Sequence, residues 1–181
     1  MILAAHYLEE TLRQMRGQKR LADGALQQVT EEEFFRELDP ESNSIAIIVQ
    51  HIAGNMRSRF TDFLTSDGEK PDRNRDQEFE LPPDATRKDF LQAWERGWKT
   101  VLDTVTSLKP EDVEKTVTIR SEPHTVLQAL NRAIAHYASH VGQIVYLAKY
   151  FRSENWKTLS VPRGKSEEFN TKMQGKHGAK V

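Results

Sequence analysis

Apolar residues in this chain recur every three or four positions in four separate segments, and this spacing constrains the fold more than any other feature. It places the apolar side chains on one face of an α-helix, whereas a half-buried strand needs an alternation of every second residue. The clearest stripe is Ile45, Ile48, Val49, Ile52, Met56, Phe60 and Phe63. We therefore predict four amphipathic helices, over about residues 3–21, 45–65, 86–108 and 125–151.

Two of these helices have recognisable starting signals. The second is expected to begin after an N-cap at Ser42, Asn43 or Ser44, because each offers a side-chain oxygen to the N–H groups of the first turn. Thr125 is followed three residues later by Gln128, which is the capping-box pattern. The fourth helix is therefore expected to begin at Thr125.

The segments between and after the helices complete the predicted architecture. Residues 66–85 contain three prolines and many charges without a period, which indicates a long loop crossing the molecule. Such loops are often functional, and the alternative is that this one is only a crossover. Residues 115–120 alternate like a short strand or an extended turn. We predict an all-α four-helix bundle over residues 1–152, with 153–181 as an irregular, partly mobile tail of the same domain.

Charge and cysteine content exclude several classes of function. With 26 basic and 27 acidic residues, the net charge of −1 provides no overall attraction for nucleic acid. The chain has no cysteine, so disulfides, thiolate zinc sites and a cysteine nucleophile are excluded, and any metal must be bound by His, Asp or Glu. The opening apolar run is too short for a signal peptide, and no run of about 18 apolar residues occurs. We therefore predict a cytoplasmic protein without a membrane span.

Three histidines are candidate metal ligands. His136 and His140 lie one helical turn apart, at the edge of the apolar face of the fourth helix. His51 lies on a flank of the stripe of the second helix. Neutral imidazole suits Zn, Ni, Cu or Fe(II), and three protein nitrogens with one open position are typical of a catalytic metal site. Alternatively, the His136 and His140 pair only hydrogen-bonds to backbone carbonyls or lines a solvent groove, and periodicity alone leaves both interpretations open.

Other polar residues near these histidines also have two interpretations. Asn55 and Gln143 each lie about one turn from a predicted ligand, and they either orient a ligand imidazole or a bound species or are ordinary polar edge residues. Arg57 and Arg59 would meet an anionic substrate group, although a solvated helix face is the commoner explanation. Catalytic residues stay unassigned. Of the remaining histidines, His6 lies in the first predicted helix, within reach of the bundle interior, while His124 is expected to be a capping or loop residue and His177 to lie in the tail.

Two sequence segments resemble a known family. The chain is similar to the DinB-like superfamily of bacterial four-helix-bundle proteins, of the bacillithiol-transferase type, in S-I-A-I-I-V-Q-H-I-A-G-N at residues 44–55 and H-T-V-L-Q-A-L-N-R-A-I-A-H-Y-A-S-H-V-G-Q-I at residues 124–144. The resemblance covers about residues 1–152. The tail, with S-V-P-R-G-K-S-E-E-F-N, indicates an uncharacterised branch of the superfamily.

The resemblance implies a set of metal ligands. In the superfamily, the histidine of the second helix and the two of the H-x-x-x-H pattern bind a divalent metal, typically nickel or zinc. The corresponding residues are His51, His136 and His140, and the pair Gly142 and Gln143 matches the Gly-Gln that tends to follow the last histidine.

The resemblance does not specify a substrate, because function depends on the site and not on the fold. The superfamily includes metal-dependent transferases that use thiols such as bacillithiol and mycothiol, a maleylpyruvate isomerase, and many members without a known reaction. We expect a divalent-metal-dependent enzyme that transfers a low-molecular-weight thiol from a cosubstrate to a small electrophile, or that activates water for hydrolysis. The alternative is a non-catalytic bundle that binds metal or a small molecule as a sensor or carrier. A homodimer is expected, and the neutral charge disfavours a role in DNA repair.

Overall fold

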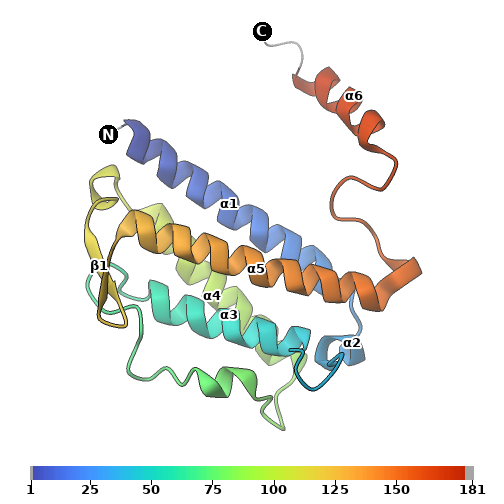
Figure 1. Ribbon diagram of the computed structural model, residues 1–181, viewed down its shortest axis with the longest axis horizontal. Coiled ribbons are helices and arrows are strands. Elements are labelled where there is room, and N and C mark those ends of the chain that lie inside the picture. Colours follow the sequence, from blue (N-terminus) through green and yellow to red (C-terminus); the bar gives the residue numbers. More distant parts are fainter. Residues whose placement is uncertain (1, 178–181) are drawn as a thin grey trace.

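The computed structural model describes residues 2–177, and the chain is mostly helical (Figure 1). The helices in this part of the chain are α1 (Ile2–Leu26), α2 (Glu31–Phe35), α3 (Ile45–Phe60), α4 (Arg87–Ser107), α5 (Val126–Arg152) and α6 (Ser166–His177). Strands β1 (Thr116–Ile119) and β2 (Glu122–Thr125) pair as an antiparallel hairpin. Three 3-10 turns are η1 (Asp76–Phe79), η2 (Pro110–Asp112) and η3 (Ser153–Asn155). Within residues 2–177, no helix combines the length and apolar character needed to cross a membrane.

Four long helices, α1, α3, α4 and α5, occupy the four segments that the apolar spacing predicts as helical. α3 packs against α4 and α5, and α1 packs against the same two helices, so all four share one core. Figure 1 shows α5 between α1 and α3. Each helix contributes a fully buried side chain: Met15, Ile52, Trp98 and Tyr137. α3 and α5, which carry the candidate histidines, are therefore neighbours.

The helix starts follow local capping signals. Gln128 and Thr125 form the predicted capping box of α5, in which the Gln128 N–H donates to Thr125 Oγ1 (3.2 Å) and the Thr125 N–H donates to Gln128 Oε1 (2.8 Å). Of the three candidates for α3, Ser44 is the N-cap, because its Oγ accepts from the Ile47 N–H at 3.3 Å. A capping box also begins α2, in a segment where the apolar spacing predicts no helix.

The connection from α3 to α4, residues 61–86, runs along α3 and contains η1 (Figure 1, green). Gln50 on α3 anchors it by donating hydrogen bonds from Nε2 to the carbonyl oxygens of Gln77 (3.0 Å) and Glu80 (2.9 Å). Glu78, which lies between these two anchor points, is buried against the middle of α3. The long loop therefore contributes a buried carboxylate to the region around His51.

The β1–β2 hairpin turns at Arg120 and Ser121, whose backbones have left-handed φ angles of 57° and 64°. Such angles are uncommon for residues other than glycine. The Asp67 carboxylate stabilises the turn by accepting hydrogen bonds from both backbone N–H groups at 2.8 Å. Nearby, the Gly68 N–H donates to the carbonyl oxygen of Thr118 at 2.8 Å. These hydrogen bonds thus hold the loop after α3 and the hairpin side by side.

The C-terminal segment differs from the predicted irregular tail. Trp156 packs against the core, but the segment beyond it forms helix α6, whose side chains are exposed as far as Lys176. Figure 1 shows α6 apart from the four long helices. Apolar periodicity does not reveal α6 because this helix has no apolar stripe, while Glu167 and Glu168 in its first turn favour a helix locally through the helix dipole. Residues 178–181 of the predicted mobile tail lie outside the described residues.

Candidate metal centre

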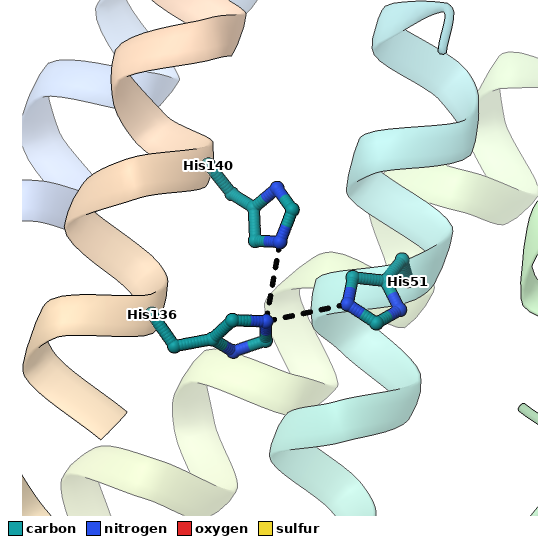
Figure 2. Close-up of side chains that lie close together, drawn as sticks. All are labelled: His51, His136 and His140. Atoms are coloured by element: carbon teal, nitrogen blue, oxygen red, sulfur yellow. Dashed lines mark hydrogen bonds between the residues drawn. The ribbon is translucent and has the colours of Figure 1, made fainter. Parts of the chain in front are cut away.

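The packing of α3 against α5 brings His51, His136 and His140 together; we call these three residues the histidine cluster. Figure 2 shows the imidazole of His51 on α3 facing the two imidazoles of α5. His136 Nε2 lies 3.3 Å from His51 Nε2 and 3.1 Å from His140 Nε2. These three residues are positioned to bind one metal ion, since their ligand atoms all lie within 4.8 Å of one another.

The spacing of these nitrogens fits a shared cation. With metal–nitrogen bonds of about 2.1 Å, two imidazole nitrogens are about 3.0 Å apart at a right angle and about 3.4 Å apart at a tetrahedral angle. The separations of 3.1 and 3.3 Å lie between these values. Neutral imidazole is also a ligand that zinc, nickel, copper and iron accept. Both the spacing and the donor type therefore suit a divalent metal.

The protonation pattern of the rings points to the same conclusion. Nδ1 of His51 donates to Glu78 Oε2 (2.8 Å), and Nδ1 of His140 donates to Gln143 Oε1 (2.7 Å). In a neutral imidazole the other nitrogen then carries a lone pair, so both Nε2 atoms direct lone pairs toward His136 Nε2. His136 has one N–H at most to offer there and cannot satisfy both. A cation at the centre of the cluster satisfies all three nitrogens.

Glu78 and Arg73 hold His51 through Nδ1, the ring nitrogen that points away from the cluster. Neither residue was predicted from the sequence. Arg73 donates to Glu78 through Nε (2.8 Å to Oε1) and Nη2 (2.8 Å to Oε2), while Glu78 accepts from His51. The Arg73 and Glu78 side chains are only 2% and 9% exposed. Burial raises the pKa of Glu78, but hydrogen bonds from His51 and Arg73 outweigh it, so the net pKa is lowered. Glu78 therefore stays ionised and holds the Nδ1–H tautomer of His51.

Gly54 makes room for this carboxylate. A Cβ at position 54 would lie 2.3 Å from Glu78 Oε1, closer than any real contact allows. Glycine inside a helix is unfavourable by about 1 kcal/mol relative to alanine, so its presence there indicates a packing reason. Gly54 follows His51 by three residues in the same helix. This glycine was the one sequence signal that could have indicated a close partner for His51.

Burial keeps the α5 histidines in the form that binds metal. It lowers the pKa of His136 to about 4, with further lowering from the nearby His140 and His51. Burial also lowers the pKa of His140, although the hydrogen bond to Gln143 opposes the shift. Both rings are therefore neutral near pH 7, and a neutral ring presents a lone pair to a metal.

Comparison with known proteins identifies a family for this chain. The family described as "Protein of unknown function (DUF1572)" matches residues 3–165. The chain belongs to DUF1572. The matched region contains the four long helices, the hairpin and all three histidines of the cluster, and it stops just before α6. No curated protein matches the chain.

The other predicted site residues of this DUF1572 protein have different surroundings. Gln143 accepts the hydrogen bond from His140 Nδ1, which is the position expected of an orienting residue. Asn55 is buried and accepts from the hydroxyl of Tyr137 at 3.3 Å. Arg57 is exposed and pairs with Asp72 at 2.9 Å, as the solvated-face interpretation predicts. Two of the remaining histidines lie outside the cluster, because His6 is exposed on α1 and His124 lies in β2. His177 is the last residue of α6.

A cavity of about 320 Å³ opens beside the histidine cluster. Its walls come from α3, α5, the hairpin and the loop after α3, and they include His51, Asn55 and His136. Arg59 also lines it, so the solvated-face interpretation is wrong for this residue. A volume of this size suits a small organic molecule. The DUF1572 site therefore has three histidines positioned to hold a metal ion and, next to them, space for a small molecule.

Proposed function

We propose that this DUF1572 protein is a metal-dependent enzyme in which His51, His136 and His140 bind one divalent ion, nickel or zinc. The observation that carries the proposal is the convergence of three Nε2 atoms beside a cavity that admits a small molecule. A purely structural metal site is usually closed by four protein ligands, whereas three ligands and an adjoining cavity are typical of catalysis.

We also propose that the fold is a four-helix bundle of the DinB-like superfamily. Three features support this assignment: the mutual packing of α1, α3, α4 and α5, the single long connection between α3 and α4, and the placement of the histidines on two facing helices. Bundles build metal sites in this way, from side chains that project from facing helices into the space between them.

The reaction favoured by the site joins a cosubstrate thiol to a small electrophile: the thiol gives up its proton, its sulfur bonds to the electrophilic atom, and the leaving group of that atom departs with the bonding electrons. A divalent ion on three imidazoles supplies a Lewis acid that lowers the pKa of a nearby thiol or water. Among the described residues, no carboxylate lines the cavity to act as a general base. A free thiol has a pKa of about 8.5 and water one of about 15.7, so a thiol needs far less help to ionise. Hydrolysis is therefore the second choice.

The chain itself contributes positioning and shielding to this reaction. Glu78 holds the His51 ring in one orientation, and Gln143 does the same for His140. The apolar side chains of Phe60 and Phe63 form part of the cavity wall and exclude water from a bound substrate. The chain has no cysteine, so the thiol has to come from a second small molecule.

The non-catalytic alternative, a sensor or carrier acting as a homodimer, needs a saturated ion without substrate access. The cavity at His51 and His136 favours the enzyme instead. The homodimer itself stays a prediction, and a molecular mass from light scattering tests it. A monomeric mass would contradict it.

Elemental analysis of the untagged protein tests the metal proposal. We expect about one equivalent of nickel or zinc per chain, lost in the double variant His136→Ala and His140→Ala. The matched control is His6→Ala, which removes an exposed histidine outside the cluster and should keep the metal. A wild-type protein that binds no metal after reconstitution with nickel, zinc, copper and iron would contradict the proposal.

Activity is tested separately with the metal-loaded protein. A screen of low-molecular-weight thiols against small electrophiles should yield turnover that His136→Ala abolishes and His6→Ala preserves. Full activity in His136→Ala would rule out the histidine cluster as the catalytic centre.

A further inference from the structure

The cavity beside the histidine cluster is unusually rich in arginine. Five arginines line it, contributed by α3, by the loop after α3, by the hairpin turn and by α5: Arg59, Arg73, Arg75, Arg120 and Arg132. Among the residues that the structure describes, no aspartate or glutamate lines the same cavity. The net charge of the whole chain is −1, so this concentration of positive charge is local.

Carboxylates behind the walls balance only part of this charge. Glu69 is shared by Arg59 (3.0 Å), Arg73 (3.2 Å) and Arg120 (3.2 Å). Glu78 pairs with Arg73, and an almost fully exposed Asp76 lies 3.9 Å from Arg75. Three carboxylates thus face five guanidinium groups.

Arg132 has no carboxylate partner within residues 2–177, and its side chain on α5 is exposed. The guanidinium charge at the cavity therefore exceeds the carboxylate charge that is paired with it, before any metal is bound. A divalent ion on the histidine cluster would add to this excess.

Arg59 is the arginine whose charge and hydrogen-bond donors are least well matched by partners. Its side chain is 11% exposed, and its buried Nη1 atom has no hydrogen-bond partner among the described residues. Burial lowers the pKa of Arg59, the ion pair with Glu69 opposes the shift, and nearby arginines, including Arg73 and Arg120, add to the lowering. A guanidinium remains charged in proteins, so this group is buried among like charges with both N–H groups of Nη1 unpartnered among the described residues. Arg57, two residues earlier, is exposed and paired instead.

Part of the cavity wall is apolar. Phe60 and Phe63 are stacked, with ring centroids 5.2 Å apart, and both line it together with Val117 and Ile119 from β1. These side chains lie on the walls that also carry the arginines. A ligand that satisfies both surfaces has an apolar body and an anionic end, and a guanidinium matches a carboxylate or a phosphate in geometry.

We propose that the cavity binds a small organic anion, a carboxylate or phosphate on an apolar body, with its anionic group against Arg59 and Arg132. The opposite end of this ligand faces His51 and His136, where the reaction takes place. This orientation rests on the proposed function, whereas recognition of the anion depends on the arginines alone. The substrate class of the enzyme is therefore an organic acid or a phosphate ester.

Isothermal titration with three probes of nearly equal size tests the proposal. Benzoate and phenyl phosphate carry the two candidate anionic groups, and benzamide is the neutral counterpart of benzoate. Each is titrated into zinc-loaded protein and into protein stripped with a chelator. We expect at least one of the two anions to bind at least tenfold more tightly than benzamide, in both forms of the protein. The tighter of the two anions identifies the group that the cavity prefers.

Three arginine variants locate the binding. Arg59→Gln should weaken binding of the preferred anion at least tenfold, and Arg132→Gln at least fivefold. Arg57→Gln is the matched control, from the same helix but outside the cavity, and should bind as the wild type does. Arg132 is exposed and has no ion pair within the described residues, so Arg132→Gln keeps the test valid if Arg59→Gln does not fold.

The outcomes separate this inference from the proposed function. Equal binding of benzamide and both anions, or wild-type affinity in folded Arg59→Gln and Arg132→Gln, would overturn the inference even if metal binds. Arginine-dependent anion binding in a protein that takes up no metal would support the inference and contradict the proposed function.

Discussion

The two halves of the histidine cluster are held in different ways. On α3, His51 is backed by Glu78 and Arg73, three side chains that are almost completely buried and hydrogen-bonded to one another in a chain. On α5, His140 is backed by Gln143, which is exposed and lies only three residues away in the same helix. The partners of His51 come from the long loop between α3 and α4, whereas the partner of His140 comes from the same helix, α5. We therefore expect changes on the α3 side to have larger effects on stability and metal binding.

Glu78→Gln should have the largest effect. Glutamine keeps an acceptor for His51 but removes the charge that the buried Arg73 guanidinium needs. Arg73 keeps Glu69 as a second partner at 3.2 Å, so loss of the Glu78 charge should lower the free energy of unfolding by about 2 kcal/mol. Zinc affinity should fall about 100-fold because a neutral amide orients the His51 ring less firmly, and makes its Nε2 less basic, than the carboxylate does. Urea denaturation of the metal-free protein and a zinc competition titration measure the two effects.

The control for this variant is Asp72→Asn, in the same loop. Asp72 is exposed and pairs with the exposed Arg57, so no measurable change is expected. If the two substitutions change stability and zinc affinity equally, the buried hydrogen bonds of Glu78 with His51 and Arg73 contribute no more than an exposed ion pair does.

Gly54→Ala and Gly142→Ala should change the free energy of unfolding in opposite directions. Alanine at position 54 overlaps Glu78 and should lower the free energy of unfolding by about 1–3 kcal/mol. A methyl group at position 142 on α5 would have nothing within 4 Å, so alanine should stabilise the protein by about 0.5–1 kcal/mol through helix propensity. Urea denaturation measures both. Stabilisation by Gly54→Ala would mean that the close approach of Glu78 is not required.

Asp67→Asn tests how firmly the loop is joined to the hairpin. The pKa of Asp67 is lowered to about 2 by the hydrogen bond from the Glu69 backbone N–H, with further lowering from those of Ser121 and Arg120. Its contribution to stability is therefore complete above its ordinary pKa near 3.8 and is lost as the pH falls toward 2.

We expect Asp67→Asn to lower the thermal midpoint by about 2 °C at pH 6 and to narrow its difference from the wild type below pH 4. Asp76→Asn, at an exposed position of the same loop, should show neither effect. If the difference in thermal midpoint between wild type and Asp67→Asn is constant from pH 6 to pH 2.5, the stabilisation of the hairpin turn does not depend on an ionised Asp67 carboxylate.

Gln143→Ala should have the smallest effect on stability, because the side chain is exposed. The free energy of unfolding should change by less than about 0.5 kcal/mol. Zinc affinity should fall about tenfold, since His140 loses the acceptor that orients its ring. Ser139→Ala, also exposed on α5, is the control and should leave zinc affinity unchanged. If Gln143→Ala lowers zinc affinity as much as Glu78→Gln does, the α3 side of the histidine cluster is no more important for metal binding than the α5 side.

Features set by neighbouring residues could be predicted from the sequence. The apolar spacing predicts the four long helices, and the pattern of Thr125 and Gln128 predicts the start of α5, because both depend on contacts within one helical turn. The same holds for the convergence of His136 and His140, which lie four residues apart. Helix α6 was not predicted because its signals are propensity and charge instead of an apolar face.

Features that depend on contacts between distant segments were decided by the tertiary structure. Glu78 lies 27 residues from His51, and no local pattern indicates that the loop folds back onto α3. The arginines of the cavity come from four separate segments. Arg59 and Arg57 lie about 200° apart around α3, but helix periodicity does not show that a cavity lies beside Arg59.

The physical reason is that helix periodicity specifies which face of a segment is buried but not which partner covers it. Burial of a charged group is favourable only where a distant chain segment supplies the opposite charge. The sequence by itself thus determined the four long helices and the histidine pair of α5, and the packing of α3, α5 and the loop decided the environment of the histidine cluster.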